Sequence, residues 1–291
     1  MNNDFAVLIL THGRPYNVAT VKTLKKHGYT GDIVIMIDDE DKTKDDYLNQ
    51  FENVEIFSKT EISKTFDEAD NFEDRRTIVY ARNASFVIAK KLGYKYFIQL
   101  DDDYTQFDFR VYSNEKQKPI KVKNIDYVFN VLLYFYKKTN FATISMAQGG
   151  DFIGGKENKM AKKPTLFRKC MNSFICSTEK PFNFVGRINE DVNTYVHEAS
   201  KGLLMGTIPF VSLTQKTTQK NKGGMSDIYE VSGTYVKSFY TVLFSPNCVK
   251  VKPMGDKHLR LHHSISWNNA VPKIVSESVK KQPSNNRANG R

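Results

Sequence analysis

The stretch Tyr96-Phe-Ile-Gln-Leu-Asp-Asp-Asp-Tyr104 decides the predicted fold of this chain of 291 residues. Its apolar part has the length of a strand, and three consecutive aspartates follow it directly. Two earlier runs, Phe5 to Leu10 and Ile33 to Ile37, have the same apolar character, and the second ends in another acidic cluster, Asp38 to Asp41. Continuous runs of this kind are typical of strands that are buried on both faces, as in parallel sheets.

Helical patterns separate these strands. Residues 15–28 begin with a proline suited to a first helical position, carry apolar residues at helical spacing and end in a glycine. A second helix is expected from near Asp74 to Leu92, and residues 54–57 predict a short third strand. The alternation predicts an α/β fold with a mostly parallel, Rossmann-like central sheet that is flanked by helices. Ligands of such sheets bind beyond the carboxyl ends of the strands, where both acidic clusters fall.

The regular alternation stops after Tyr104. We expect an edge segment at residues 118–123, an aromatic-rich helix from Val122 to Lys138 and a glycine-rich loop at residues 149–155. Residues 276–291 are polar and basic without apolar periodicity, which is typical of a flexible tail.

The remaining residues, 1–275, are predicted to form one domain whose two halves differ in charge. The chain carries a net charge of +11, of which residues 1–103 contribute −5 and residues 104–291 contribute +16. We therefore divide the domain into an acidic half, residues 1–104, and an elaborated basic half, residues 105–275. The basic half suggests contact with a polyanion such as nucleic acid, and a solvated basic surface is the alternative.

Composition argues against several classes of protein. The longest apolar-rich run, residues 127–136, falls well short of the roughly twenty residues of a membrane-spanning helix. The opening Met-Asn-Asn-Asp is not typical of a secretory signal. Three cysteines, Cys170, Cys176 and Cys248, lack zinc-site spacing, and we expect them to be reduced in a cytoplasmic protein. A membrane span, a disulfide scaffold and a zinc finger are therefore not predicted.

The three consecutive aspartates predict a metal site. Adjacent carboxylates repel one another unless a cation neutralises them. Alternate residues of an extended segment point the same way, so Asp101 and Asp103 can converge on one ion. Oxygen ligands suit Mn²⁺ or Mg²⁺, and the phosphates of a substrate often complete the coordination of such ions. The alternative is a solvated acidic loop, and for Asp38 to Asp41 a solvated turn is equally well supported.

A nucleotide would have to be bound without the usual glycine-rich motifs. The sequence contains neither GxxxxGK[ST] nor GxGxxG, so a P-loop and a dinucleotide site are both unsupported. Binding would then depend on the metal and on side chains such as Arg14 and Arg82. His12 follows the first strand directly and is expected to face the nucleotide.

The segment Gly186-Arg-Ile-Asn-Glu-Asp191 carries the second chemical signal. Two neighbouring carboxylates, Glu190 and Asp191, open a predicted helix, where the helix dipole stabilises negative charge. A helix cap is one interpretation of these residues. A general base for a hydroxyl acceptor is the other.

Histidines and basic loops supply further candidates. His258, His262 and His263 cluster within six residues, and one of them could give an imidazole to the metal, or all three could simply alternate along a strand. Two segments, residues 156–169 and 215–224, are rich in lysine and could approach phosphates. The candidate DNA contacts in them are Lys156, Lys159, Lys162, Lys163, Arg168, Lys216, Lys220 and Lys222.

In this order the motifs resemble the GT-A class of nucleotide-sugar glycosyltransferases and, more closely, the TET-associated glycosyltransferases found mainly in tailed bacteriophages. The resemblance extends over nearly the whole chain up to about Lys273. It rests on these segments: Thr11-His-Gly-Arg14, Ile37 to Asp41, Asp74-Arg-Arg, Tyr80-Ala-Arg-Asn83, Tyr96 to Tyr104, Gly186 to Asp191, Gln215 to Gly224, Gly233 to Tyr240 and His262-His263.

The resemblance implies transfer of a sugar from a UDP-sugar to a 5-hydroxymethylpyrimidine in DNA, with 5-hydroxymethylcytosine as the first candidate. It makes residues 1–104 the donor half and residues 105–275 the acceptor half. Asp191 is implied as the general base, with Glu190 as its rival, and an inverting mechanism is favoured. The implied metal ligands are Asp101, Asp103, His262 and His263. The implied donor-binding residues are Thr11, His12, Arg14, Asp38, Asp39, Arg82 and Asp102.

Two other functions stay open on the sequence alone. The first is a glycosyltransferase that acts on a cell-surface glycan, a protein or a lipid instead of DNA. The second is a protein of another class, either a metal-dependent nucleotidyltransferase or an inactive nucleic-acid-binding module. The sequence does not indicate an oligomeric state.

Overall fold

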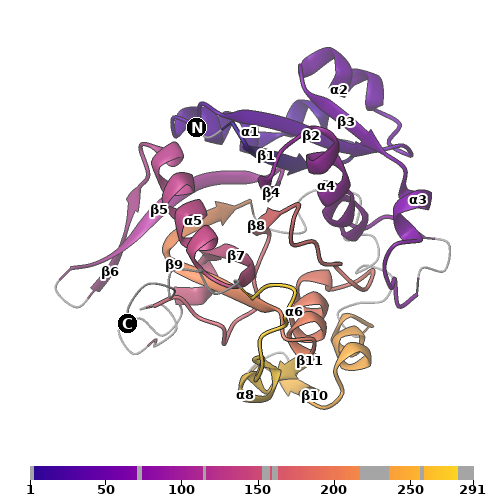
Figure 1. The fold of residues 1–291 in the computed structure, drawn as a ribbon, viewed down its shortest axis with the longest axis vertical. Helices are drawn as coiled ribbons and strands as arrows, with labels where there is room; N and C mark the ends of the chain where they lie inside the picture. Colours follow the sequence, from indigo (N-terminus) through magenta and orange to yellow (C-terminus); the bar gives the residue numbers. More distant parts are fainter. Residues whose placement is uncertain are drawn as a thin grey trace, which may run out of the picture.

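A computed structural model describes most of the chain (Figure 1). The described residues are 3–70, 74–113, 116–152, 158, 163–216, 236–255 and 259–280. The first half contains β1 (Phe5–Leu10), η1 (Pro15–Asn17), α1 (Ala19–Lys26), β2 (Asp32–Asp38), α2 (Lys44–Gln50), β3 (Val54–Phe57), α3 (Lys59–Ser63), α4 (Val79–Lys91) and β4 (Tyr96–Asp101). The second half contains β5 (Tyr104–Ser113), β6 (Lys116–Lys121), α5 (Ile125–Lys138), β7 (Phe141–Gln148), η2 (Gly149–Phe152), β8 (Ser173–Ser177), α6 (Glu190–Ser200), β9 (Leu204–Gln215), a helical segment at 236–244, β10 (Val249–Met254), β11 (Arg260–Ile265) and α8 (Trp267–Ala270).

Nine strands form one mixed sheet, in the order β3-β2-β1-β4-β8-β7-β9-β5-β6. The first four strands are parallel, as the apolar runs predict. Beyond β4 the sheet is no longer regular, because β8 pairs antiparallel to both β4 and β7, whereas β7 and β9 are parallel. The predicted α/β class is confirmed, and the parallel part of the sheet belongs to the acidic half of the chain.

Alternate side chains of the buried strands contribute to two apolar cores, one on each face of the sheet. In β1, Phe5, Val7 and Ile9 pack with α1 and α5, whereas Ala6 and Leu8 pack with α4 and α6. Figure 1 shows helices on both sides of the sheet. Burial on both faces explains why these strands have continuous apolar sequences.

The first residues of α1 fix the turn that carries the three aspartates. The hydroxyl of Thr20 donates to the carbonyl of Asp101 at 2.6 Å and accepts from the backbone N–H of Tyr104 at 2.9 Å. The backbone N–H of Thr20 donates to the carbonyl of Asp102 at 3.1 Å. One buried threonine therefore bonds to three of the four residues 101–104 in the turn at the carboxyl end of β4.

Several predicted boundaries differ from the structure. The helix expected from Val122 begins at Ile125, because the side chain of Asn124 caps it by accepting from the backbone N–H of Tyr127. The helix expected from near Asp74 begins at Val79, because Asp74 accepts hydrogen bonds from Arg76 in a turn before the helix. Residues 276–280, predicted as the start of a flexible tail, form a turn that bonds to the carbonyl of Gly202 and buries Val279. Residues 281–291 lie outside the described part. In that part no helix has the length and apolar character needed to cross a membrane.

We predict that Thr20→Val lowers the free energy of unfolding by about 2–4 kcal/mol. The substitution keeps the shape of the side chain but leaves a buried carbonyl and a buried N–H without partners, and each costs about 1–3 kcal/mol. Urea denaturation followed by circular dichroism measures the difference. The control is Thr60→Val at an exposed position of α3, for which we expect a change below about 0.5 kcal/mol. Equal stability of the two variants would contradict the role of Thr20.

Candidate active site

The ends of β1 and β4 are joined by side chains that the sequence singled out. The hydroxyl of Thr11 donates to Asp102 at 2.6 Å and lies 2.8 Å from the hydroxyl of Tyr47. The guanidinium of Arg14 lies 3.3 Å from the carboxylate of Asp102. The backbone N–H of Arg14 donates to the hydroxyl of Tyr47. Asp102 is buried, so its carboxylate mainly organises this edge, whereas the partly exposed side chain of Arg14 can also face a ligand.

A second polar group lies at the end of β2. Asp38 accepts from the imidazole of His12 at 2.7 Å and from the ammonium of Lys59 at 3.0 Å. The hydrogen bond to Asp38 raises the pKa of His12, and these two cationic partners lower the pKa of Asp38 although burial opposes the change. Asp41 binds the backbone N–H of Gly13 at 2.7 Å, and Asp39 accepts from the backbone N–H of Lys59. These bonds tie the predicted donor-binding residues of β1 and β2 into one edge.

Arg82 connects this edge to the second half of the chain. Its fully buried guanidinium donates to Asp101 at 2.9 Å and to Glu190 at 3.3 Å, and it lies 4.9 Å from the centre of the Phe174 ring. Burial raises the pKa of both Asp101 and Glu190, while Arg82 opposes the rise. In the structure Arg82 positions two carboxylates, and its expected role in binding a nucleotide stays a prediction.

Asp103 provides the strongest indication of a cation. Burial, together with the nearby carboxylates of Asp101 and Asp102, raises the pKa of Asp103 to about 6. One of its oxygens accepts from Gln215 at 3.2 Å, and the other is buried without a hydrogen-bond partner among the described residues. A buried, unpartnered carboxylate oxygen beside another carboxylate fits a hard divalent cation.

The histidine part of the predicted metal site is not assembled. Within the described ranges, no three His, Cys, Asp or Glu side chains converge as a metal-binding group. The Nδ1–H of His262 donates to the carbonyl of His263 at 2.7 Å, and His263 lies 3.4 Å from the side-chain amide of Asn189. Coordination by histidine stays a prediction. Asp101 and Asp103 are the carboxylates that the structure brings together, and substrate phosphates would complete the coordination sphere.

Glu190 and Asp191 have opposite environments at the start of α6. The ammonium of Lys169 lies 2.5 Å from Asp191, and Asp191 also accepts from the backbone N–H of Val192. Burial alone would raise the pKa of Asp191, but the charge of Lys169 brings the pKa below its ordinary value. Asp191 is therefore ionised, whereas Glu190 is bound to Arg82. Neither Glu190 nor Asp191 is the N-cap of α6. Asn189 occupies that position, with its backbone in the left-handed conformation.

Two further groups face Asp191 from the last part of the chain. Burial lowers the pKa of Lys237. Burial also lowers the pKa of His263, and with the charges of His262 and Lys169 it brings that pKa to about 4. Asp191 acts in the opposite direction on both groups, so they lie within its electrostatic reach. The side chain of Asn189 holds this region in place by donating to Thr241 at 2.6 Å.

The basic loops are only partly described. Five of the predicted DNA contacts lie outside the described residues, namely Lys156, Lys159, Lys162, Lys220 and Lys222. Lys163 and Lys216 are exposed, and the backbone N–H of Lys216 donates to the carbonyl of Asp103. Arg168 pairs with Asp151, so its charge is already partly compensated. His258 also lies outside the described part.

Sequence reasoning missed four residues of the site: Lys59, Lys169, Gln215 and Lys237. Lys59 is brought to Asp38 by the pairing of β2 with β3, and no spacing in the sequence indicates that contact. Gln215 reaches Asp103 because β9 pairs with β5, which follows the aspartates directly. Lys169 belongs to a basic segment that was assigned to DNA, so its charge was noticed but its carboxylate partner was not.

The fold and the polar edge of its sheet together indicate a class of protein. A parallel half-sheet carries clustered carboxylates and cationic side chains at its carboxyl edge, which is where α/β proteins of the Rossmann-like class bind their ligands. The family described as TET-Associated Glycosyltransferase matches residues 5–224, which is well over half of the chain. The chain belongs to this family and is a glycosyltransferase. None of the curated protein sequences matches it.

Several crystal structures have a distant likeness to the chain. One, a mycobacterial protein, has a TM-score of 0.48 and 7% identity, with 90% of this chain and 83% of that chain covered. Glucosyl-3-phosphoglycerate synthase from Mycobacterium tuberculosis, in complex with Mn²⁺, UDP and phosphoglyceric acid, has a TM-score of 0.47 and 8% identity, with 90% and 86% covered. TarS 1-349 from S. aureus has a TM-score of 0.40 and 11% identity, with 72% and 59% covered. Family membership does not depend on these likenesses.

We predict that Lys169→Met destabilises the protein by about 2–3 kcal/mol at pH 7, because Asp191 would remain as a buried charge without its main partner. The lowered pKa of Asp191 contributes stability above its unfolded-state pKa, and this contribution is lost as the pH falls through the folded-state pKa. The difference between the two proteins should therefore shrink below about pH 4. Denaturant titrations between pH 3 and pH 8 measure it.

The control for this prediction is Lys64→Met, which removes an ion pair with Glu61 at 2.7 Å in which both side chains are exposed. Exposed pairs contribute about 0–1 kcal/mol, so this variant should lose much less stability at pH 7. If Lys169→Met lost no more stability than the control, or if its loss of stability did not depend on pH, the pairing of Lys169 with Asp191 would be contradicted.

Proposed function

We propose that the protein transfers a sugar from a UDP-sugar to the hydroxyl of a 5-hydroxymethylpyrimidine in DNA, with 5-hydroxymethylcytosine as the first candidate. The observation that carries the proposal is the ionised carboxylate of Asp191, which is paired with Lys169 and lies in one electrostatic cluster with Asp101. A base for an acceptor hydroxyl is thereby adjacent to the carboxylates that would hold a donor. This adjacency is what an in-line transfer between two substrates requires.

The donor would bind at the carboxyl edge of β1, β2 and β4. Asp38 and His12 offer an acceptor and a donor of hydrogen bonds to a nucleoside, and Arg14 offers a cation to its phosphates. Asp101 and Asp103 would hold a divalent cation, Mn²⁺ or Mg²⁺. When bound, this cation would neutralise the diphosphate and stabilise the departing UDP. Thr20 and Arg82 keep the two carboxylates in place.

Asp191 would remove the proton from the acceptor hydroxyl. The low pKa that Lys169 gives this carboxylate keeps it in the basic form, and hydrogen bonding to the hydroxyl would align the attacking oxygen. Glu190 is the rival candidate: both carboxylates have a cationic partner, but burial raises the pKa of Glu190, whereas Lys169 keeps Asp191 ionised. A single base on the acceptor side supports an inverting mechanism.

DNA as the acceptor is supported by the family and by charge. The family description associates these glycosyltransferases with TET proteins, and the second half of the chain carries a net charge of +16. A basic surface binds DNA through its phosphates, with an affinity that falls steeply as the salt concentration rises. A 5-hydroxymethyl group lies in the major groove, so the hydroxyl is accessible before the base is fully extruded.

The test supplies the protein and Mn²⁺ with a panel of UDP-sugars and duplex DNA. The duplexes contain cytosine, 5-hydroxymethylcytosine or 5-hydroxymethyluracil, and the DNA is then digested to nucleosides for mass spectrometry. A mass gain of one sugar on a hydroxymethylated base, and none on cytosine, is the expected result. Release of UDP from a donor without a gain on any DNA would contradict the DNA acceptor while leaving a glycosyltransferase.

We predict that Asp103→Asn abolishes transfer and also removes the increase in melting temperature that Mn²⁺ gives the wild-type protein. Without metal, the variant should melt at least as high as the wild type at pH 8, because it removes a buried charge whose pKa is raised to about 6. Differential scanning fluorimetry with and without Mn²⁺ measures both effects. A variant that is still stabilised by Mn²⁺ to the same extent would contradict the metal assignment.

We predict that Asp191→Asn lowers kcat by at least about 100-fold, which is typical of losing general-base catalysis, and changes UDP-sugar affinity only a few-fold. Stopped-time transfer assays and calorimetric titration with the donor measure the two quantities. Glu61→Gln, at an exposed position of α3, is the matched control and should leave both unchanged. Loss of donor binding in Asp191→Asn would instead assign this carboxylate to the donor site.

A further inference from the structure

Helix α1 carries three exposed lysines, and it begins at the catalytic edge. The backbone N–H of Thr20, in its first turn, donates to the carbonyl of Asp102. Lys22, Lys25 and Lys26 are exposed, and residues three and four positions apart share one face of a helix. The helix has 8 residues, so it is about 12 Å long. Its lysines therefore extend from within one turn of the aspartates to the far end of the helix.

At that far end, α1 meets the segment that leads from β6 into α5. The imidazole of His27 lies 2.5 Å from the carbonyl of Val122, and the backbone N–H of Ile125 donates to the carbonyl of His27 at 2.8 Å. Burial lowers the pKa of His27, and the charges of Lys121 and Lys26 lower it further. Lysines from both elements therefore create positive potential in the same place. Figure 1 shows α1, β5 and β6 on the same side of the molecule.

Three more exposed lysines belong to the segment after β5. We call the six side chains together the lysine track: Lys22, Lys25, Lys26, Lys118, Lys121 and Lys123. None of the six forms an ion pair with another residue of the described ranges. Two carboxylates lie nearby, and neither pairs with a lysine of the track: Asp108 accepts from the side-chain amide of Gln106, and Asp126 accepts from Thr30. The six lysines outnumber these two carboxylates, so the track is a surface with an excess of positive charge.

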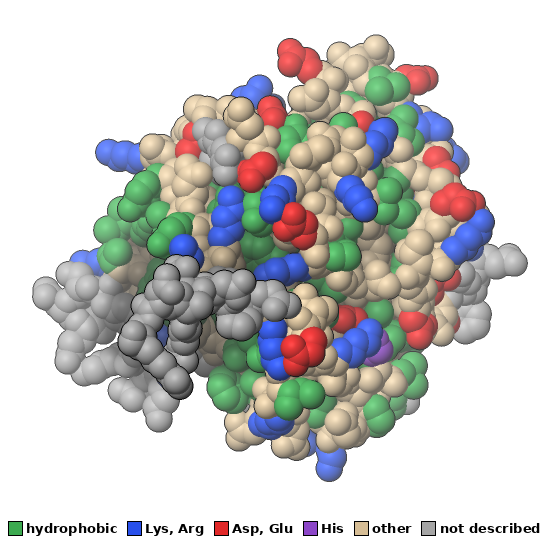
Figure 2. Space-filling view, viewed as in Figure 1, with side chains coloured by type: hydrophobic (Ala, Val, Ile, Leu, Met, Phe, Trp, Pro, Cys, Tyr) green, Lys and Arg blue, Asp and Glu red, His purple; other side chains and the backbone are tan. Residues whose placement is uncertain are grey.

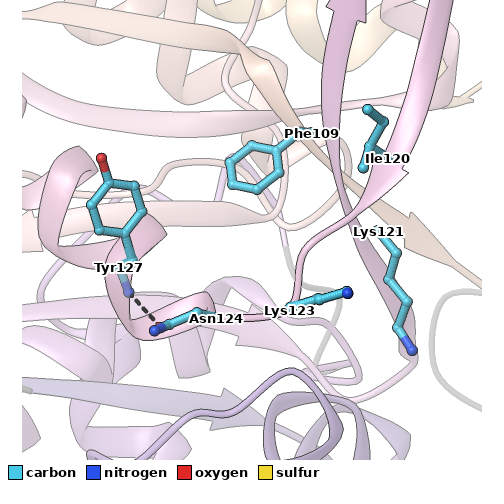
Figure 3. A pocket seen from close by; sticks show the side chains of 6 residues that line it. All are labelled: Phe109, Ile120, Lys121, Lys123, Asn124 and Tyr127. Carbon is cyan, nitrogen blue, oxygen red and sulfur yellow. Dashed lines mark hydrogen bonds between the residues drawn. The ribbon is translucent and has the colours of Figure 1, made fainter.

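An open pocket of about 460 Å³ lies at the end of the track. It is lined by Phe109, Ile120, Lys121, Lys123, Asn124 and Tyr127. Figure 3 shows Phe109 and Tyr127 presenting their rings to the pocket, with the two lysines beside them. The ring of Tyr127 is 63% exposed and Ile120 is 53% exposed, so both are free to contact a partner. Figure 2 shows basic and apolar side chains together on this side of the molecule.

We propose that the lysine track and its pocket bind the sugar–phosphate backbone of the acceptor DNA. A series of like charges without carboxylate partners suits a polymer of regularly spaced negative charges better than a single ion. The aromatic rings between the lysines would pack against the apolar faces of deoxyribose. The residues of this surface differ from those of the segments 156–169 and 215–224, and the surface begins beside the aspartates. The identity of the polyanion rests on the function proposed above.

The test measures binding of an unmodified duplex of about 30 base pairs by fluorescence anisotropy at several salt concentrations. Two variants, Lys25→Gln/Lys26→Gln and Lys121→Gln/Lys123→Gln, each remove two charges. Each should reduce the slope of log affinity against log salt by about 2, since every phosphate contact contributes about 0.9. The matched control is Lys64→Gln/Lys90→Gln, which removes two exposed lysines from the region of α3 and α4. Slopes that equal that of the control would overturn the proposal.

The pocket is tested separately with Tyr127→Ala. Loss of an uncharged ring should weaken binding about three- to tenfold without changing the salt slope, because no phosphate contact is removed. Tyr134→Ala removes an equally exposed ring two turns further along α5 and should bind like the wild type. Equal affinities of these two variants would remove the pocket from the interface.

These binding measurements use neither donor nor modified base, so they are independent of sugar transfer. If the wild type modifies DNA but the lysine variants bind like the control, the track is wrong and the proposed function stands. If the wild type modifies no DNA but the track variants lose binding, the proposed acceptor is wrong and the surface stands. Absence of both transfer and duplex binding in the wild type would contradict both.

Discussion

The buried guanidinium of Arg82 is the interaction on which the site depends. It lies between Asp101 at the end of β4 and Glu190 at the start of α6, and its plane faces the ring of Phe174. An isolated buried charge costs several kcal/mol, so the arginine and the two carboxylates can be buried only as a group. The relative position of β4, α4 and α6 is therefore fixed by charge pairing as well as by apolar packing.

The next residue of α4 strengthens the same junction. The side-chain amide of Asn83 donates to the carbonyl of Phe184 at 2.9 Å and accepts from its backbone N–H at 2.8 Å. Two consecutive residues of α4 thus bind the segment that leads to α6, one through charge and one through backbone hydrogen bonds. Because that segment belongs to the basic half, the carboxyl edge of the parallel strands and the second half of the chain meet along α4. In the proposed function, small changes in this helix would alter the distance between the two substrates.

The parallel half of the sheet follows from sequence because its signal is local. The apolar runs at β1, β2 and β4, and the acidic residues at the ends of β2 and β4, are each visible within about ten residues of sequence. The contacts of the second half are not local: Lys169 reaches Asp191 across 22 residues, and Gln215 reaches Asp103 across 112. Arg82 was recognised by its type, but its burial between two carboxylates depends on packing that no spacing encodes. The types of residue at this site could therefore be predicted from the sequence, whereas the pairs that these residues form could not.

Charge balance explains why two neighbouring carboxylates of α6 differ. Asp101, Asp103, Glu190 and Asp191 lie in reach of four described cations, Arg14, Arg82, Lys169 and Lys237. Arg82 pairs with Asp101 and Glu190, Lys169 pairs with Asp191, and Arg14 pairs with Asp102. Asp103 forms no ion pair among the described residues, and its pKa is raised to about 6. A donor diphosphate could not approach such a carboxylate without a cation between them, because like charges repel strongly in a partly buried site. In the proposed function a divalent cation would therefore be needed at Asp103, whereas the ionised state of Asp191 depends on Lys169 and requires no metal.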